Sequence, residues 1–300
     1  MNDFKDKVAV ITGAGSGFGR EFARIGAARG MKLVLADIQA DALEQTRIEL
    51  EAQGTQVIAR VLDVSDGSHI EALAAAAMEA FGSVNLLFNN AGVATSGLVW
   101  ESSVRDWEWT LGVNLWGVIH GVRIFTPLML ASAKTDPDYR GHIVNTASMA
   151  GLVNQPILGA YNVSKHAVVS LSETLFQDLS LVTDQVHCSV LCPYFVPTGI
   201  NESQRNRPSS LTNEAPATPS QLLVQAMASK AVTSGKLTAE HIAKLTFDAI
   251  ERDAFYVFSH PHALESIRDN AENLVALRDP ADPFAYKPEL RAQLITALRH

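Results

Sequence analysis

Short apolar runs rich in β-branched residues alternate with helix-forming segments along most of this chain. The segments 18–29, 40–53 and 68–81 have apolar residues at helical spacing and are long enough to connect neighbouring parallel strands. This alternation predicts an α/β fold with a doubly wound parallel sheet covered by helices on both faces. Seven strands are expected, at residues 7–12, 32–37, 56–62, 84–89, 142–147, 186–192 and 255–259.

The chain is large enough and apolar enough to fold around one core. Its 300 residues are 47% hydrophobic and 19% charged, so folding needs no support from metals or disulfides. No repeat and no Pro/Ser-rich linker divides the chain, which predicts a single dinucleotide-binding and catalytic domain over residues 1–260. Within it, the Pro-, Asn- and Ser-rich segment 194–235 is expected to form a substrate lid or loop. Residues 261–300 are expected to form a helical C-terminal extension.

The charge balance disfavours two classes of partner. A net charge of −8 has the wrong sign for binding a nucleic-acid backbone or an anionic membrane surface. The most apolar stretch, residues 113–130, predicts a buried helix rather than a membrane span, because polar side chains interrupt it. We therefore expect no nucleic-acid and no membrane partner. The interrupting side chains are Asn114, His120, Arg123 and Thr126.

The two cysteines indicate a reducing environment. Cys188 and Cys192 lie on one expected strand, about 13 Å apart, which is too far for a disulfide. Two reduced core thiols, together with an N-terminus that does not read as an export signal, favour a cytoplasmic protein. A metal site is not expected, since His260 and His262 have no third ligand at a useful spacing.

A glycine-rich turn follows the first expected strand and opens the first helix. Gly13, Gly17 and Gly19 are separated by four and then two residues. Glycine permits positive φ and close approach of the backbone to a diphosphate, and the following helix N-terminus directs N–H groups to the same place. A merely flexible turn is the alternative. The residues expected to bind a dinucleotide here are Gly13, Ser16, Gly17, Phe18 and Gly19.

An acidic residue ends the second expected strand. Asp37 lies 18 residues after Gly19, where a carboxylate can accept hydrogen bonds from both hydroxyls of an adenosine ribose. The same carboxylate would repel a 2′-phosphate. We therefore expect NAD rather than NADP as the cofactor, and a turn or cap role for Asp37 is the alternative.

Tyr161 and Lys165 form a candidate proton-transfer pair. They lie four residues apart on an expected helix, so both side chains share one face. A free phenol has a pKa of about 10 and is a poor base at neutral pH, but a nearby cation lowers the pKa of an acid. We expect Lys165 to make Tyr161 acidic enough to exchange a proton with an alcohol oxygen. Taken alone, the spacing is frequent by chance and favours a solvated lysine.

Three further polar residues accompany this pair. Ser148 follows the fifth expected strand and precedes Tyr161 by 13 residues, which places its hydroxyl to bind the reacting oxygen. Asn90 follows the fourth strand, beside small residues that let a cofactor pass close to the backbone. Asn114 interrupts an apolar helix, where a buried polar group needs a partner. All of them are expected near the carboxyl ends of the strands, where open α/β sheets bind ligands.

Together these motifs resemble the short-chain dehydrogenase/reductase family, in its single-domain NAD(P)-dependent branch with a Rossmann-type fold. The resemblance covers residues 7–198 and the strand at 255–259. At one position the chain departs from the family, because Tyr194 follows Pro193 where glycine is usual. The resemblance rests on Thr12-Gly13-x3-Gly17-x-Gly19, Asn89-Asn90-Ala91-Gly92, Asn114, Ser148, Tyr161-x3-Lys165 and residues 193–198.

The resemblance implies four catalytic roles. Tyr161 is the general acid/base, and Ser148 positions and polarises the substrate oxygen. Lys165 lowers the pKa of the tyrosine and holds the nicotinamide ribose. Asn114 helps to hold a water in a proton relay.

It also implies contacts with the cofactor beyond the glycine turn. Asp63 and Val64 contact the adenine, and Asn90 contacts the adenosine-side ribose. The Val196 backbone and Thr198 contact the nicotinamide amide. The departure at Tyr194 puts a bulky ring near these last contacts.

The apolar side chains near the expected site predict an apolar substrate. We expect hydride transfer between NAD and a hydrophobic secondary alcohol or ketone, aromatic ones included. The segment around Tyr256 resembles family members that oxidise lignin-derived benzylic alcohols. The residues expected to line the substrate pocket are Met149, Leu152, Val153, Ile157, Leu158, Tyr194 and Phe195.

Two other functions are compatible with the same fold. A catalytically silent NAD sensor would need no proton donor, and an epimerase or dehydratase would have a different glycine spacing and a larger substrate domain. The helices around 115–130 and 167–179 are more apolar than one sheet face requires. In the family such helices pair across a two-fold axis, which implies a homodimer or homotetramer.

Overall fold

A parallel sheet of seven strands organises the protein. The structure is a computed structural model that describes residues 1, 3–233 and 235–299. The strand order is β3-β2-β1-β4-β5-β6-β7, and each neighbouring pair is parallel. The doubly wound Rossmann-type fold is thus confirmed. The strands are β1 (Val8–Thr12), β2 (Lys32–Asp37), β3 (Val57–Val61), β4 (Leu86–Asn89), β5 (Gly141–Thr146), β6 (Val186–Cys192) and β7 (Tyr256–Phe258).

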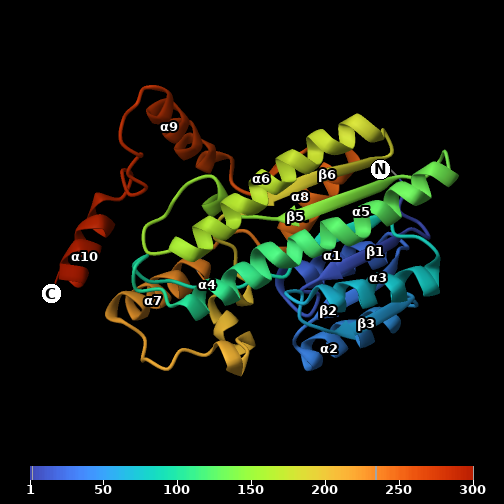
Figure 1. The fold of residues 1–300 in the computed structure, drawn as a ribbon, viewed down its shortest axis with the longest axis horizontal. Helices are drawn as coiled ribbons and strands as arrows, with labels where there is room; N and C mark the ends of the chain where they lie inside the picture. Colours follow the sequence, from blue (N-terminus) through green and yellow to red (C-terminus); the bar gives the residue numbers. More distant parts are fainter. Residues whose placement is uncertain (2, 234, 300) are drawn as a thin grey trace.

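Helices cover both faces of the sheet (Figure 1). Successive side chains of β1 point to opposite faces, so that Ile11 belongs to the core on one side and Val10 to the core on the other. The helices of the first face are α1 (Gly17–Ala28), α2 (Ala40–Glu51) and α8 (Ala239–Glu251). Those of the second face are α3 (Gly67–Phe81), α5 (Gly117–Thr135) and α6 (Gly159–Val182).

The strand order reverses between β1 and β4. After β1, the chain adds β2 and β3 in one direction and then returns to pair β4 with the other side of β1. A crevice opens at the carboxyl ends of two such strands, because their connections leave in opposite directions. Thr12 joins the two ends: its hydroxyl donates to the Phe88 carbonyl at 3.2 Å and accepts from the Asn90 N–H at 2.9 Å.

A long helical run crosses the second face. The helix α4 (Val104–Leu111) continues through a π-helical turn, Gly112–Trp116, into α5. The helix expected at 113–130 is therefore present, as part of a longer element. Within the described residues, the run Val104–Thr135 is the one helical stretch with the length and hydropathy of a membrane span. Its inner side chains Phe125 and Met129 are buried in the core of the sheet.

The expected lid is more regular than its composition suggests. It contains two 3₁₀ segments, Gly199–Asn206 and Ser209–Leu211, followed by α7 (Pro219–Thr233). The helix α7 was not anticipated from the sequence. It is stabilised by packing, because Val224 lies in a small apolar cluster with Leu294 from the far end of the chain.

The C-terminal extension is helical, as expected. It consists of α9 (Leu264–Val275) and α10 (Pro288–Arg299), which project from the body of the molecule (Figure 1). Leu294 of α10 is buried against Val224 of α7. The helix α9 has no buried residue, but its Ile267 packs against the core cluster that includes Ala263.

The cysteine prediction is confirmed, since Cys188 and Cys192 are both free and buried in β6. Among the described residues, no group of three His, Cys, Asp or Glu side chains is arranged to bind a metal. The side chain of His262, which was considered above as a metal ligand, lies outside the part of the chain that the structure describes.

Candidate active site

The glycine turn between β1 and α1 forms a compact cradle. Gly13 and Gly17 have φ of 67° and 52°, which side chains other than glycine rarely adopt. A Cβ at Gly19 would lie 2.0 Å from the Gly13 carbonyl oxygen. Ser16 precedes α1 without capping it through its side chain, and no acidic residue occupies the first turn. The N–H groups of this helix end therefore face an environment suited to an anion.

Asp37 lies at the end of β2, beside this turn. Its Oδ2 accepts from the Gly15 N–H at 2.8 Å, and its Oδ1 accepts from the Gln39 N–H at 2.9 Å. These bonds orient the carboxylate and tie the end of β2 to the glycine turn. Asp37 consequently has both a structural role, as in the alternative considered from the sequence, and a position at the edge of the groove.

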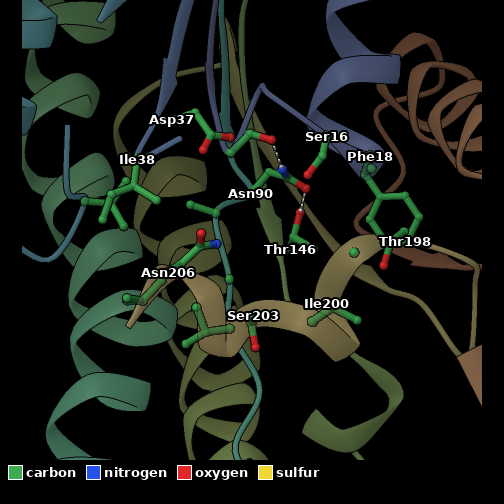
Figure 2. A pocket seen from close by; sticks show the side chains of 18 of the residues that line it. Ser16, Phe18, Asp37, Ile38, Asn90, Thr146, Thr198, Ile200, Ser203 and Asn206 are labelled. Carbon is green, nitrogen blue, oxygen red and sulfur yellow. Dashed lines mark hydrogen bonds between the residues drawn. The ribbon is translucent and has the colours of Figure 1, made fainter. Parts of the chain in front are cut away.

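A groove runs along the carboxyl ends of the strands, between the glycine turn and the segment Gly199–Asn206. Figure 2 shows Asp37 and Ile38 at one end, Ser16 and Phe18 near Thr198, and Ser203 and Asn206 along the opposite side. The expected site residues that line it are Gly13, Ser16, Gly17, Phe18, Asp37, Asp63, Val64, Asn90, Tyr161, Lys165 and Thr198.

Four expected site residues do not line this groove. Gly19 packs against Gly13, and the Val196 side chain is buried in the core below. Asn114 and Ser148 lie behind the lining residues and act through their hydrogen bonds. Asn90 does line the groove, but its Nδ2 already donates to the Thr12 carbonyl at 2.9 Å.

Several lining residues were missed in the sequence. They lie after β2, in α4 and the π-helical turn, at other strand ends and in the segment after Thr198, and the only signal for the last group was the change in composition after Pro193. The missed residues are Ile38, Gln39, Leu62, Val93, Trp109, Val113, Thr146, Ala147, Gly199, Ile200, Ser203, Arg205 and Asn206.

Ser148, Tyr161 and Lys165 converge at one end of the groove. The helix α6 begins at Gly159, so Tyr161 and Lys165 occupy its first two turns. The Ser148 hydroxyl lies close enough to the Tyr161 phenol to lower its pKa, and it also accepts from the Ala150 N–H at 3.1 Å and donates to the Pro193 carbonyl at 3.4 Å. Lys165 Nζ donates to the Thr146 carbonyl at 2.8 Å and lies 5.8 Å from the centre of the Tyr161 ring. The three groups that proton exchange with an alcohol would need are thus adjacent.

The expected depression of the Tyr161 pKa by Lys165 is not what the structure shows. Burial raises the pKa of Tyr161 above its usual range, and the hydrogen bond from Ser148 is the influence that lowers it. Burial also lowers the pKa of Lys165 to about 8. The ammonium group donates to the Thr146 carbonyl at 2.8 Å and lies over the ring of Tyr161, and desolvation is the largest cause of both shifts.

Asn114 lies in the π-helical turn and is fully buried. Its Nδ2 donates to the Val93 carbonyl at 2.9 Å and to the Ser164 hydroxyl at 3.0 Å, and its Oδ1 accepts from the Val93 N–H at 2.8 Å. The side chain therefore links the loop after β4 to α6, next to Tyr161. The expected contact of Asn114 with a relay water stays a prediction.

The apolar residues expected to line a substrate pocket do not line this groove. Ile157 and Leu158 pack with α7 and α10, and Met149 and Leu152 join a core cluster. The Tyr194 ring lies 4.7 Å from the Phe195 ring and 5.6 Å from the His260 ring. The bulky side chain that replaces the usual glycine thus contacts the segment after β7.

Comparisons with known proteins identify relatives of the whole chain. The sequence matches the family model described as short chain dehydrogenase over residues 7–209. A CLA biosynthesis dehydrogenase/reductase of Lactiplantibacillus plantarum is 36% identical, over 92% of this chain and 95% of that protein. C alpha-dehydrogenase of Sphingobium sp. (strain NBRC 103272 / SYK-6) is 32% identical, over 99% of this chain and 94% of that protein.

A solved structure supports the same assignment. The crystal structure of a short chain dehydrogenase/reductase SDR from Burkholderia phymatum in complex with NAD has 54% sequence identity and a TM-score of 0.91. The match covers 94% of this chain and 99% of that chain. With the strand order, the glycine cradle and the Ser148, Tyr161 and Lys165 side chains in place, the chain belongs to the short-chain dehydrogenase/reductase family.

Proposed function

We propose that this protein is an NAD-dependent oxidoreductase that interconverts a hydrophobic secondary alcohol, aromatic alcohols included, and its ketone. The observation that carries the proposal is the convergence of Ser148, Tyr161 and Lys165 beside a groove built on the glycine turn. The similar Sphingobium protein is named a C alpha-dehydrogenase, which agrees with a dehydrogenase activity.

The donor set of the groove fits a dinucleotide. The glycine turn and the uncapped start of α1 offer N–H groups to a diphosphate, and the Asp37 carboxylate lies where an adenosine ribose would bind. Asp37 favours NAD because a 2′-phosphate would approach its negative charge. The similar Burkholderia structure contains NAD.

Residues of this chain transfer the hydroxyl proton of the alcohol. When bound, the nicotinamide accepts or returns the hydride of the alcohol carbon. During oxidation, the Tyr161 oxygen takes the hydroxyl proton as the carbonyl forms, and during reduction it returns that proton. The Ser148 hydroxyl orients both the phenol and the substrate oxygen, and Lys165 binds the nicotinamide ribose. Lys165 is buried, whereas Ser148 and Tyr161 are half-buried, which limits the access of bulk water to the reacting atoms.

The kind of substrate and the cellular compartment belong to the same proposal. The protein acts on a small molecule, and we propose that it works in the cytoplasm, where the buried thiols Cys188 and Cys192 stay reduced.

A substrate panel tests the proposed activity. Aryl, alicyclic and small polar alcohols are incubated with NAD, and NADH formation is followed by absorbance. Turnover is expected with the hydrophobic secondary alcohols. Turnover confined to small polar polyols would contradict the substrate class, and NADH binding without turnover on any alcohol or ketone would support the silent sensor instead.

Tyr161→Phe separates catalysis from cofactor binding. The variant loses the proton donor and keeps the ring, so turnover should fall by about 10²–10⁴-fold while NADH affinity stays within a few-fold of the parent. Initial rates and a fluorescence titration with NADH measure the two quantities. Unchanged turnover would remove Tyr161 from the mechanism.

A further inference from the structure

The segment Gly199–Asn206 crosses the groove from one end of the proposed dinucleotide site to the other. At its start, Thr198 contacts the glycine turn, since a Cβ at Gly17 would lie 3.3 Å from the Thr198 Cβ. At its end, Asn206 Oδ1 accepts from Gln39 Nε2 at 2.7 Å, two residues after Asp37. Figure 2 shows Thr198, Ser203 and Asn206 along this path. The segment thus lies over the part of the groove where a diphosphate would bind.

A buried serine attaches the middle of the segment to the protein. The Ser203 hydroxyl accepts from the Ala94 N–H at 3.0 Å and donates to the Ala94 carbonyl at 3.3 Å. Its exposed fraction is 3%. With contacts at both ends and in the middle, the segment has a defined position relative to the glycine turn.

Arg205 carries a cation on this segment into the lining of the groove. Its Nη1 donates to the Gly199 carbonyl at 3.0 Å and lies 3.5 Å from a carboxylate oxygen of Glu202. The guanidinium therefore lies against the residue that follows Thr198, close to the glycine turn. Both interactions use Nη1, which leaves Nε and Nη2 without a protein partner in the described part of the chain.

The charged side chains of the groove include one cation that is available to bind a diphosphate. The charged side chains that line it are Asp37, Asp63, Lys165 and Arg205. The two carboxylates lie at the adenosine end, and Lys165 is bound to the Thr146 carbonyl beside Tyr161. Arg20 of α1 is paired with Glu49 at 2.8 Å and does not line the groove. Arg205 is thus the lining cation that remains for a diphosphate.

We propose that Arg205 binds the diphosphate of the dinucleotide, and this inference rests on the proposed function. A diphosphate carries two negative charges into a protein whose net charge is −8, so neutral N–H groups of the glycine turn leave its charge incompletely balanced. A guanidinium offers planar paired donors to phosphate oxygens. The cation comes from the lid segment, so the same contact also holds the segment closed over the cofactor.

Arg205→Gln tests the proposal by cofactor binding rather than by activity. NADH is titrated by fluorescence against the parent, Arg205→Gln and Arg205→Lys at several NaCl concentrations. Arg205→Gln should raise the Kd for NADH about tenfold at low salt, because a charge-assisted hydrogen bond is lost. Its Kd should also depend less on NaCl than that of the parent. Arg205→Lys should recover most of the affinity and the salt dependence.

Arg278→Gln is the matched control, because it removes one positive charge from an exposed part of the C-terminal extension. Its NADH affinity and salt dependence should equal those of the parent. Thermal melting of each variant checks that the fold is retained.

The titrations distinguish a failure of the proposed function from a failure of the inference about Arg205. A parent protein that binds neither NADH nor NADPH contradicts the proposed function itself. A parent that binds NADH while Arg205→Gln stays within twofold of it overturns only this inference. The inference is also overturned if Arg205→Gln weakens binding with the salt dependence of the parent, or changes only the KM for the alcohol, which would assign Arg205 to the substrate.

Discussion

At the scale of single residues, the proton chemistry depends on the balance between burial and one hydrogen bond. Burial raises the pKa of Tyr161, and the Ser148 hydroxyl opposes that increase by stabilising the phenolate. Alcohol oxidation needs the deprotonated phenol, so kcat/KM for oxidation should rise with pH. Ser148→Ala should move this rise to higher pH and lower kcat/KM at neutral pH by at least about tenfold.

A pH profile of the Ser148 variants measures this effect. Ser148→Thr is the matched control, because it keeps a hydroxyl and should return the profile toward that of the parent. If Ser148→Ala lowers the rate equally at every pH, the serine acts on the substrate alone and not on the Tyr161 pKa.

We expect Asp37 to control the choice between NAD and NADP in the proposed enzyme. Asp37→Asn removes the negative charge but keeps an oxygen that can accept from the Gly15 N–H. We expect the ratio of kcat/KM for NADP to kcat/KM for NAD to increase about tenfold or more, which corresponds to about 1.4 kcal/mol. Rates with both cofactors give the ratio. A parent enzyme that already prefers NADP would show that the carboxylate does not discriminate.

Residue patterns in the sequence predicted those parts of the candidate site that depend on local spacing along the chain. The Tyr161 and Lys165 pair follows from helical spacing, and Asp37 follows from its place at a strand end. Gly19 approaches its own chain at the Gly13 carbonyl oxygen, which a motif alone does not reveal, and its expected contact with the cofactor stays a prediction. Asn206 could not be found in this way, since its partner Gln39 is 167 residues away.

At the scale of elements, strands and crossover helices were predictable, whereas elements defined by tertiary contacts were not. The alternation of apolar runs determines the sheet because both faces of each strand are buried. The π-helical turn Gly112–Trp116 depends on the bonds of Asn114 to Val93 and Ser164, which lie on other elements. Likewise, α7 is helical in a Pro-rich segment because its apolar side packs against α10.

The opposite end of the sheet contains a buried histidine that should make stability depend on pH. His142 of β5 shares a 2.7 Å hydrogen bond with Ser189 of β6, and its Nδ1 lies 3.7 Å from Asp253. The other ionisable groups near it are His187 and the N-terminal amine. Burial lowers the pKa of His142, and this effect exceeds the opposing attraction of Asp253.

The direction of the pH effect follows from that lowered pKa. The unfolded chain binds a proton at His142 more readily than the folded protein does, below a pH of about 6.5. Stability is therefore present in full above that pH and is lost as the pH falls below it. Thermal melting between pH 7.5 and 5 should show the loss, and His142→Gln should reduce it. An equal loss in both proteins would assign the effect to other groups.

At the scale of the whole molecule, the described surface carries apolar side chains that the fold itself does not cover. Trp116 is 52% exposed and Leu181 of α6 is 82% exposed, while the C-terminal extension exposes Leu274 and Val275. Isolated apolar residues on a surface need no explanation, but exposed apolar side chains recur along α6, at Val163, Phe176, Leu181 and Val182, and Trp116 lies just before α5. The projecting extension places a second apolar region away from the body (Figure 1).

We expect the protein to form a homodimer or homotetramer through the outer side of α5 and α6. A two-fold axis would bring the same apolar side chains of two subunits together and bury them. Size-exclusion chromatography with light scattering should give a mass of two or four chains at micromolar concentration. Trp116→Glu should shift the measured mass toward that of one chain, because a buried unpaired carboxylate weakens such an interface. Val61→Glu is the matched control, since Val61 is similarly exposed, at 58%, on the edge strand β3. It should leave the mass unchanged, whereas a parent protein that runs as a monomer would refute the expected assembly.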